Sequence, residues 1–143
     1  MAAEARLVLA VGLGAALGSV ARYLCSLGMV HLLGPGFPWG TLTVNLLGSL
    51  LIGLYATLTE PGGRVAASPA RLQFVLTGFC GGFTTFSVFS LETLLLFEQR
   101  SFVSAGFYVG LSLLLWLLAV LTGHRIGTCM NRPKNERPGT STN

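Results

Sequence analysis

Four apolar stretches, each of membrane-spanning length, take up most of this 143-residue chain. They run over about 7–33, 39–59, 72–97 and 102–123, with short polar connections between them. Crossing a bilayer takes about 20 predominantly apolar helical residues. In the hydrocarbon core every backbone N–H and C=O must be satisfied by the protein, which a helix does within its own segment. The sequence therefore predicts an all-α integral membrane protein with four transmembrane helices.

The composition excludes a disordered chain and argues against a soluble one. Charged residues make up only 10% of the sequence and hydrophobic residues 52%, whereas an ordinary soluble domain is roughly 25% charged. A small soluble protein needs polar groups to cover its large relative surface. We expect one transmembrane domain over 1–128, surrounded by a lipid bilayer, and a polar, disordered tail over 129–143. The net charge of +4 predicts no nucleic-acid partner, because much of it lies in or beside this tail.

The charged residues outside the spans indicate an orientation. Four spans place both chain ends on one side of the membrane, and Arg100 is the only cation in the connections on the other side. Short cytoplasmic segments are typically enriched in Lys and Arg, which favours cytoplasmic termini. The cations on that side are Arg6, Arg64, Arg71, Arg125, Arg132, Lys134 and Arg137.

The third stretch contains poor helix chemistry in its middle, where Gly81-Gly82 is followed by Thr84-Thr85. Glycine costs backbone entropy in a helix, and β-branched threonine loses side-chain freedom there. The third helix is therefore predicted to be broken mid-membrane. Such a break needs protein or a water-filled cavity around it, and its unwound carbonyls can coordinate a cation. A simple helix kink without a ligand is the alternative.

Small residues at a spacing of four predict close helix contacts. Gly14 and Gly18 form a GxxxG pair, Gly106 and Gly110 form another, and Ser49 with Gly53 is a related pair. Such pairs let two helix backbones approach closely in a membrane. They predict a tight bundle and carry no information about what it transports.

Beyond the break, aromatic and hydroxyl side chains share neighbouring helix faces. Phe86 and Phe89 are three residues apart, as are Ser87 and Ser90, so each pair lies on one face. The positive edge of a phenylalanine ring could hold a small anion weakly, as conduction requires. The alternative is ordinary packing for the rings and hydrogen bonding of the serines to their own helix backbone.

Other polar side chains within the spans are mostly neutral donors. Asn45 could join two helices or donate to an anion, while Tyr108 and Ser112 share one face of the fourth span. Arg22 is the one strong cation in the spans and Glu92 the one carboxylate. Either could be structural. Donors without a buried base favour the passage of an anion over proton-coupled exchange.

Taken together, these motifs resemble the CrcB/Fluc family of fluoride channels. The resemblance covers roughly residues 7–128. Its most specific part is the segment from Gly78 to Glu92 in the third span, which reads GFCGGFTTFSVFSLE. The first span adds GSVAR over residues 18–22, the second adds GTLTVNLLG over residues 40–48, and the fourth adds Tyr108 and Ser112. Val88 departs from the family motif, where a threonine is common.

This resemblance implies a passive fluoride-selective channel in the bacterial plasma (inner) membrane that exports cytoplasmic fluoride and gives fluoride resistance. It implies an antiparallel homodimer with two fluoride pores and a central structural sodium ion, although the charge bias described above is unusual for a protein that inserts both ways. The sodium would be held by the backbone carbonyls of Gly81 and Thr84. Arg22 and Glu92 would be mouth or structural residues. The implied pore residues are Asn45, Phe86, Phe89, Tyr108, Ser112, Ser87 and Ser90.

Three other classes of function remain open from the residues alone. A small four-helix, proton-coupled multidrug-type transporter would need a carboxylate inside the membrane, for which Glu92 is the available candidate. A membrane scaffold would leave the intramembrane donors and the helix break without a role. We do not expect an enzyme, because the sequence shows no nucleophile–base pair, metal constellation or phosphate-binding loop.

Overall fold

The computed structural model describes residues 1–132, and these residues form helices and no strands. The first two membrane-length helices are α1 (Ala2–Leu33) and α2 (Trp39–Leu58), and the last is α6 (Phe102–Asn131). The third spanning helix consists of four consecutive segments along one axis, which are α3 (Pro69–Leu72), the π-helical η1 (Gln73–Cys80), α4 (Gly81–Phe83) and α5 (Ser87–Glu98). Four helices are thus long and apolar enough to cross a membrane, and the predicted all-α class is confirmed.

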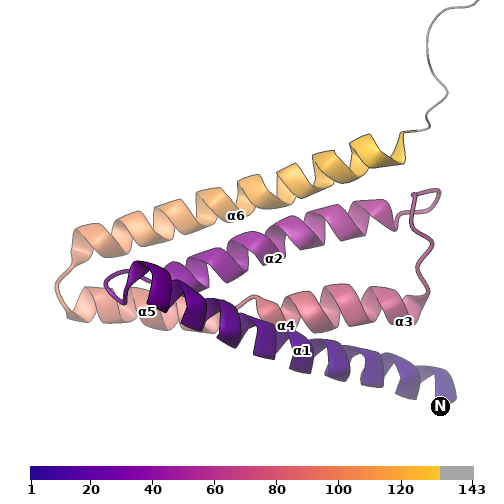
Figure 1. Ribbon diagram of the computed structural model, residues 1–143, viewed down its shortest axis with the longest axis horizontal. Coiled ribbons are helices and arrows are strands. Elements are labelled where there is room, and N and C mark those ends of the chain that lie inside the picture. Colours follow the sequence, from indigo (N-terminus) through magenta and orange to yellow (C-terminus); the bar gives the residue numbers. More distant parts are fainter. Residues whose placement is uncertain (133–143) are drawn as a thin grey trace, which may run out of the picture.

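The helices lie side by side as two close pairs. In Figure 1, α6 lies along α2, and α1 crosses the line formed by α3, η1, α4 and α5. The beginning of α1, the connection from α2 to α3 and the end of α6 all lie at one end of the bundle. Both ends of the described chain are therefore on the same side, as four spans require.

Glycines bring α1 against the third helix. A Cβ on Gly14 or Gly18 would overlap backbone atoms of η1, and a Cβ on Gly82 would overlap the backbone of Ala15. The contact predicted for the Gly14 and Gly18 pair is confirmed. The Gly106 and Gly110 pair instead has open space around it within residues 1–132, so it makes no helix contact inside the subunit.

The third helix breaks where the threonines lie. It ends at Phe83, Thr84 is extended with φ −83° and ψ 160°, and the helix restarts at Ser87. Gly81 and Gly82 are themselves helical, so the break that the sequence predicts is confirmed and lies at the threonines of that segment, not at its glycines. A helix tolerates glycine, and Gly82 serves the close approach to α1.

The fourth helix continues well past the predicted end of the span at residue 123. It runs to Asn131, whose Nδ2 donates to Thr57 O at 2.8 Å and whose Oδ1 accepts from Arg64 N at 2.8 Å. Thr57 Oγ1 lies 2.7 Å from His124 Nδ1. Residues 129–131, which we predicted in the disordered tail, are therefore helical and tied to α2. The rest of that tail lies outside the described residues.

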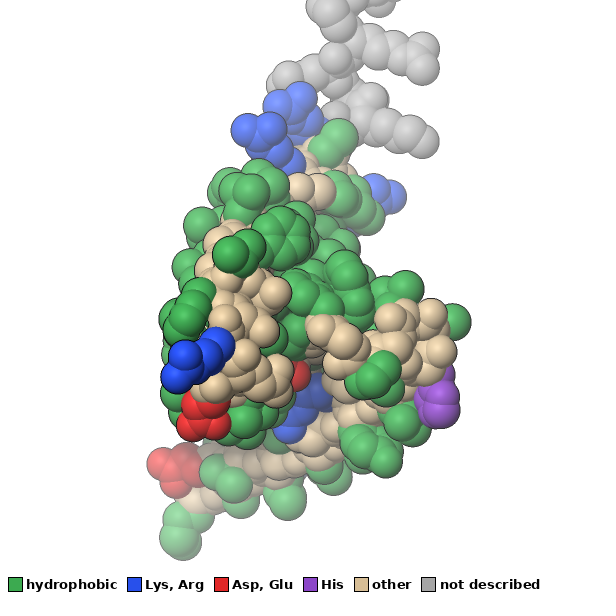
Figure 2. All heavy atoms as spheres, turned by 90° about the vertical axis from the view of Figure 1, so that its left-hand side faces the viewer, with side chains coloured by type: hydrophobic (Ala, Val, Ile, Leu, Met, Phe, Trp, Pro, Cys, Tyr) green, Lys and Arg blue, Asp and Glu red, His purple; other side chains and the backbone are tan. Residues whose placement is uncertain are grey.

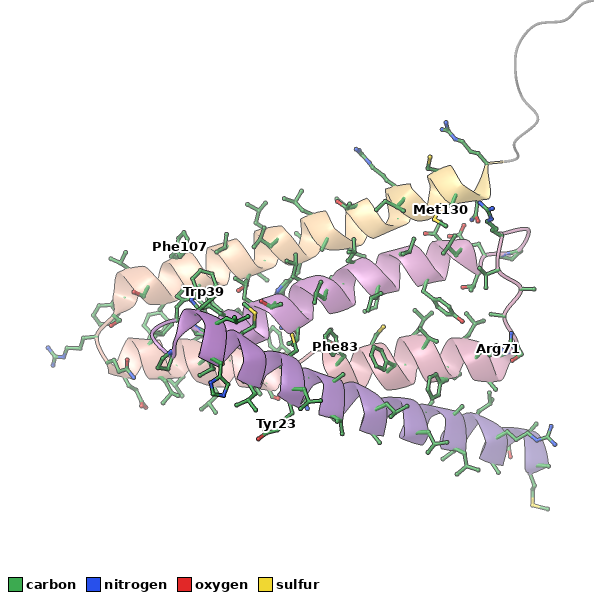
Figure 3. All side chains as sticks on the ribbon, viewed as in Figure 1. Tyr23, Trp39, Arg71, Phe83, Phe107 and Met130 are labelled. Carbon is green, nitrogen blue, oxygen red and sulfur yellow. The ribbon has the colours of Figure 1, made fainter. Side chains whose placement is uncertain are left out.

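The surface of the subunit is mostly apolar. Figure 2 looks onto the end where α5 turns into α6, and hydrophobic side chains cover most of this face, with charged side chains at a few separate positions. Tyr23 points away from the other helices in Figure 3, and Leu9 and Leu13 on the same helix are 64% and 62% exposed. Lipid or another protein must cover these side chains.

Candidate functional site

Asn45 joins α2 to the broken segment through two hydrogen bonds. Its Nδ2 donates to Thr85 O at 2.8 Å, and its Oδ1 accepts from Thr85 N at 2.7 Å. The amide thus satisfies both backbone hydrogen-bonding groups of Thr85, a residue that lies outside the helix. Of the two readings of Asn45, joining two helices is the one the structure shows. An amide nitrogen carries two protons, so Nδ2 retains one for a further acceptor.

The two phenylalanines lie at different depths. Their ring centroids are 5.6 Å apart with an angle of 47° between the planes. Phe86, at the start of α5, is 69% exposed, whereas Phe89 is 6% exposed. Phe89 lies within an aromatic cluster, with ring centroids 5.1 Å from Tyr108 and 4.9 Å from Trp116. One ring of the predicted pair is therefore free on the subunit surface.

The two serines beside these rings make local contacts. Ser90 Oγ donates to Phe86 O at 2.9 Å, which is the backbone bonding expected of a helical serine. Ser87 Oγ lies 3.2 Å from Thr85 Oγ1, which also accepts from Val88 N at 3.2 Å. The side chain of Thr85, which the sequence marked only as a poor helix former, therefore organises the start of α5.

Glu92 is held by hydroxyl groups from two other helices. Tyr108 Oη donates to Oε2 at 2.7 Å, and Thr41 Oγ1 donates to Oε1 at 2.9 Å. Thr41 and Glu92 also line a cavity of about 340 Å³ that Trp39 and Gln99 border. This cavity lies at the end of the bundle shown in Figure 2. Glu92 therefore lines an outer cavity and, through its hydrogen bond to Tyr108, is joined to the aromatic cluster.

Two donors on α6 are buried with no partner among the described residues. They are Ser112 Oγ and Trp116 Nε1. Four residues separate them, so they lie on one face of the helix. Trp116 also lines a cavity of about 200 Å³ together with Asn45, Thr85 and Phe86. Trp116 is not among the residues predicted from the sequence, although its spacing of four residues from Ser112 was a usable signal.

The break releases two backbone carbonyls from the helical ladder. Thr85 N donates to Asn45 and not to Gly81 O, and Val88 N donates to Thr85 Oγ1 and not to Thr84 O. Arg22 Nη1 approaches Thr84 O at 3.3 Å. Arg22 thus contacts the broken backbone, which gives this charged side chain a hydrogen-bond partner inside the subunit. Carbonyl oxygens are suitable ligands for a hard cation, so the donor chemistry at Gly81 and Thr84 fits sodium.

Residues 1–132 contain no group of three or more His, Cys, Asp or Glu side chains that could hold a metal ion. The polar side chains that line the cavity beside Phe86 carry amide, hydroxyl and indole groups, while the Glu92 carboxylate reaches the aromatic cluster from the other side through Tyr108. Four apolar helices, a break at membrane depth and uncharged donors beside it define a multi-pass membrane protein with a polar interior.

The family follows from comparison with known proteins. Residues 9–124 match the family described as CrcB-like protein, Camphor Resistance (CrcB), and the chain belongs to this family. A relative from Rhodopseudomonas palustris is 46% identical over 131 residues, covering 92% of this chain and 93% of its own. A relative from Bradyrhizobium diazoefficiens is 50% identical over 124 residues, covering 87% and 86%. A relative from Opitutus terrae is 48% identical over 128 residues, covering 90% and 97%.

The first two relatives are named fluoride-specific ion channel FluC 1 and the third fluoride-specific ion channel FluC. They come from bacteria, where such a chain with four spanning helices belongs to the plasma membrane. The predicted family and multi-pass membrane location are thus confirmed. The relatives are channels and not enzymes, in agreement with the non-enzymatic function expected from the sequence.

Proposed function

We propose that this protein is a fluoride-selective channel that lets cytoplasmic fluoride leave the cell passively and so gives fluoride resistance. The observation that carries the proposal is the gathering of uncharged donors around Phe86 and Phe89. The free proton of Asn45 Nδ2 and the partnerless Ser112 Oγ and Trp116 Nε1 belong to this group. The names of the relatives point to the same ion.

Neutral donors suit conduction because they hold an anion without trapping it. An ion in a channel must bind well enough to enter and weakly enough to leave, usually at several positions. Ring edges supply further weak positive potential. In this proposal the ion passes Asn45 and the phenylalanine rings, then Ser112 and Tyr108. Ser87 and Ser90 lie beside that route, on the exposed side of α5.

We further propose that two subunits assemble as an antiparallel homodimer with two pores. Phe86 is 69% exposed and Gly81 is exposed although both lie at the break. Irregular backbone at membrane depth must be covered by protein or line a water-filled cavity. A second copy packed on this face would cover the break and complete a path on each side of the dimer.

The same packing supports a central sodium ion. The carbonyl oxygens of Gly81 and Thr84, one pair from each subunit, would hold it, and its charge would stabilise the paired helix ends. Arg22 lies against Thr84 O and would share this backbone with the ion. Thermal unfolding of the purified dimer in sodium and in a large organic cation tests this role, with higher stability expected in sodium. Equal stability in both would contradict it.

Ion efflux from liposomes tests the channel proposal. Purified protein is reconstituted, and external fluoride and chloride are followed with selective electrodes. Wild type should release fluoride quickly and chloride slowly, and Phe86→Ile and Asn45→Asp should slow fluoride release. Phe107→Ile, which alters an exposed ring on α6, is the matched control and should behave as wild type. Folded wild-type dimer that retains fluoride would overturn the proposal.

Orientation needs a separate test. Reporter domains fused to the C-terminus, one active only in the cytoplasm and one only outside it, should both be active if the protein inserts both ways. Activity on one side alone would contradict the antiparallel arrangement, whatever the outcome of the efflux experiment.

A further inference from the structure

A groove lies between the first part of α1, the end of α2 and the beginning of the third helix, far along the bundle from Glu92. It has a volume of about 500 Å³. Its walls are mainly apolar, with Leu9 and Leu13 from α1 and Phe74 and Val75 from η1. Leu9 and Leu13 are more than half exposed, so the groove is open along its length.

Two arginines border this groove at one end. Arg6 directly precedes the apolar run of α1, and Arg71 directly precedes that of the third helix. Both helices begin at the same end of the bundle, where Arg71 is labelled in Figure 3. In the described part of the chain, the one ion pair joins the N-terminal amine to Glu4 at 3.4 Å. Neither guanidinium is therefore neutralised by a carboxylate there.

We propose that this groove binds an anionic phospholipid. Arg6 and Arg71 would hold its phosphate, and an acyl chain would lie along Leu9, Leu13 and Phe74. A guanidinium matches phosphate geometry with two parallel hydrogen bonds. Cations at the ends of apolar runs lie at the level of lipid headgroups, where basic pockets between helices attract anionic lipids. The apolar walls favour a lipid over a free phosphate ion, which would use only the arginine end.

Lipid retention by the purified full-length protein tests this site. The protein is equilibrated with phosphatidylglycerol or phosphatidylcholine and analysed by native mass spectrometry. Wild type should favour phosphatidylglycerol by about tenfold or more, because each nearby cation attracts anionic lipid. The double variant Arg6→Gln/Arg71→Gln should lose that preference. Arg125→Gln, which removes an exposed cation from the same end of the bundle, is the control and should keep it.

A second variant separates the groove from its charges. Ala10→Trp fills the groove and leaves both arginines in place, so it should reduce retention of both lipids. Inorganic phosphate in excess should not displace phosphatidylglycerol. Fluoride efflux should persist in the double variant, so failure of the lipid site and failure of the channel proposal remain distinguishable.

Four results would overturn the proposal. Wild type could retain the two lipids equally, or Arg125→Gln could lose as much preference as the double variant. Inorganic phosphate could displace the lipid, which would indicate a simple anion site. Finally, the groove variants could shift the protein from dimer to monomer, which would show that a second copy of the chain covers this groove.

Discussion

Tyr108 Oη and Glu92 Oε2 lie 2.7 Å apart, and this hydrogen bond joins α6 to α5. Thr41 on α2 holds the other carboxylate oxygen at 2.9 Å. Three helices therefore meet on one acidic side chain that lies inside the bundle. This arrangement gives Glu92 a structural explanation, and a proton-coupled mechanism is not needed to account for it.

The change Glu92→Gln separates a channel from a proton-coupled transporter. Glutamine keeps one oxygen that can accept from Tyr108 or Thr41, but its NH2 group replaces the second acceptor and the negative charge is lost. We therefore expect a loss of about 1–3 kcal/mol in stability. Fluoride efflux should persist in the variant and should not depend on an imposed pH gradient. Efflux that follows the pH gradient in wild type and disappears in Glu92→Gln would favour the multidrug-type alternative.

Removal of the Asn45 side chain should damage both folding and conduction. In Asn45→Ala, Thr85 N–H and C=O lose their partners, at a cost of about 1–3 kcal/mol for each buried group. Fluoride efflux should also fall, because the free Nδ2 proton is lost. Thermal unfolding and efflux are measured on the same preparation.

Asn131→Ala is the matched control for Asn45→Ala. Asn131 also makes two hydrogen bonds to backbone atoms, at the far end of α6. The variant Asn131→Ala should lower the unfolding temperature without slowing fluoride efflux in the protein that remains folded. Equal effects of the two variants on efflux would show that Asn45 acts only through stability.

Trp116→Phe tests the indole N–H as a donor. The ring contact with Phe89 is largely kept, while the partnerless Nε1 is removed. Loss of one hydrogen bond worth about 1 kcal/mol should slow fluoride passage roughly fivefold. The other tryptophan of the chain is Trp39, and fluoride efflux from Trp39→Phe serves as the comparison. If fluoride efflux is unchanged in Trp116→Phe, the indole does not contribute to the path.

Gly18→Ala should force α1 away from the third helix. A Cβ there would overlap the carbonyl oxygen of Phe79, which belongs to the backbone and cannot rotate away. We expect a loss of about 1–3 kcal/mol, typical of overpacking, measured by thermal unfolding. Gly12→Ala on the same helix has nothing within 4 Å and should be neutral or slightly stabilising.

Length and hydropathy were sufficient to predict the four helices, because a bilayer imposes its thickness on every span. The exact site of the break was harder to predict. Gly81 and Gly82 were the weakest helix formers in the segment, yet they remain helical, and Gly82 lies against the backbone of Ala15 on α1. The helix leaves its path at Thr84, where Asn45, forty residues earlier, takes the Thr85 N–H.

The sequence predicted which residue types belong to the site better than it predicted the groups to which they are hydrogen-bonded. The spacing of four residues between Ser112 and Trp116 can be read from the sequence, but an indole in an apolar helix is usually a packing residue. The structure adds that Trp116 Nε1 is buried without a hydrogen-bond partner among the described residues. The helical end at Asn131 was missed because polar residues suggested a tail. Local composition does not reveal that Asn131 is bonded to the carbonyl of Thr57 and the amide of Arg64.

Asn45 contacts the main chain of Thr85, and this has an evolutionary consequence. When two side chains bond each other, a change in one can be rescued by a change in the other, and the pair covaries among homologues. No substitution at position 85 alters the peptide N–H and C=O that Asn45 binds, apart from proline, which removes the N–H. We therefore expect position 45 to remain asparagine across the family without a covarying partner, so that maps of coevolving residues would not show this contact.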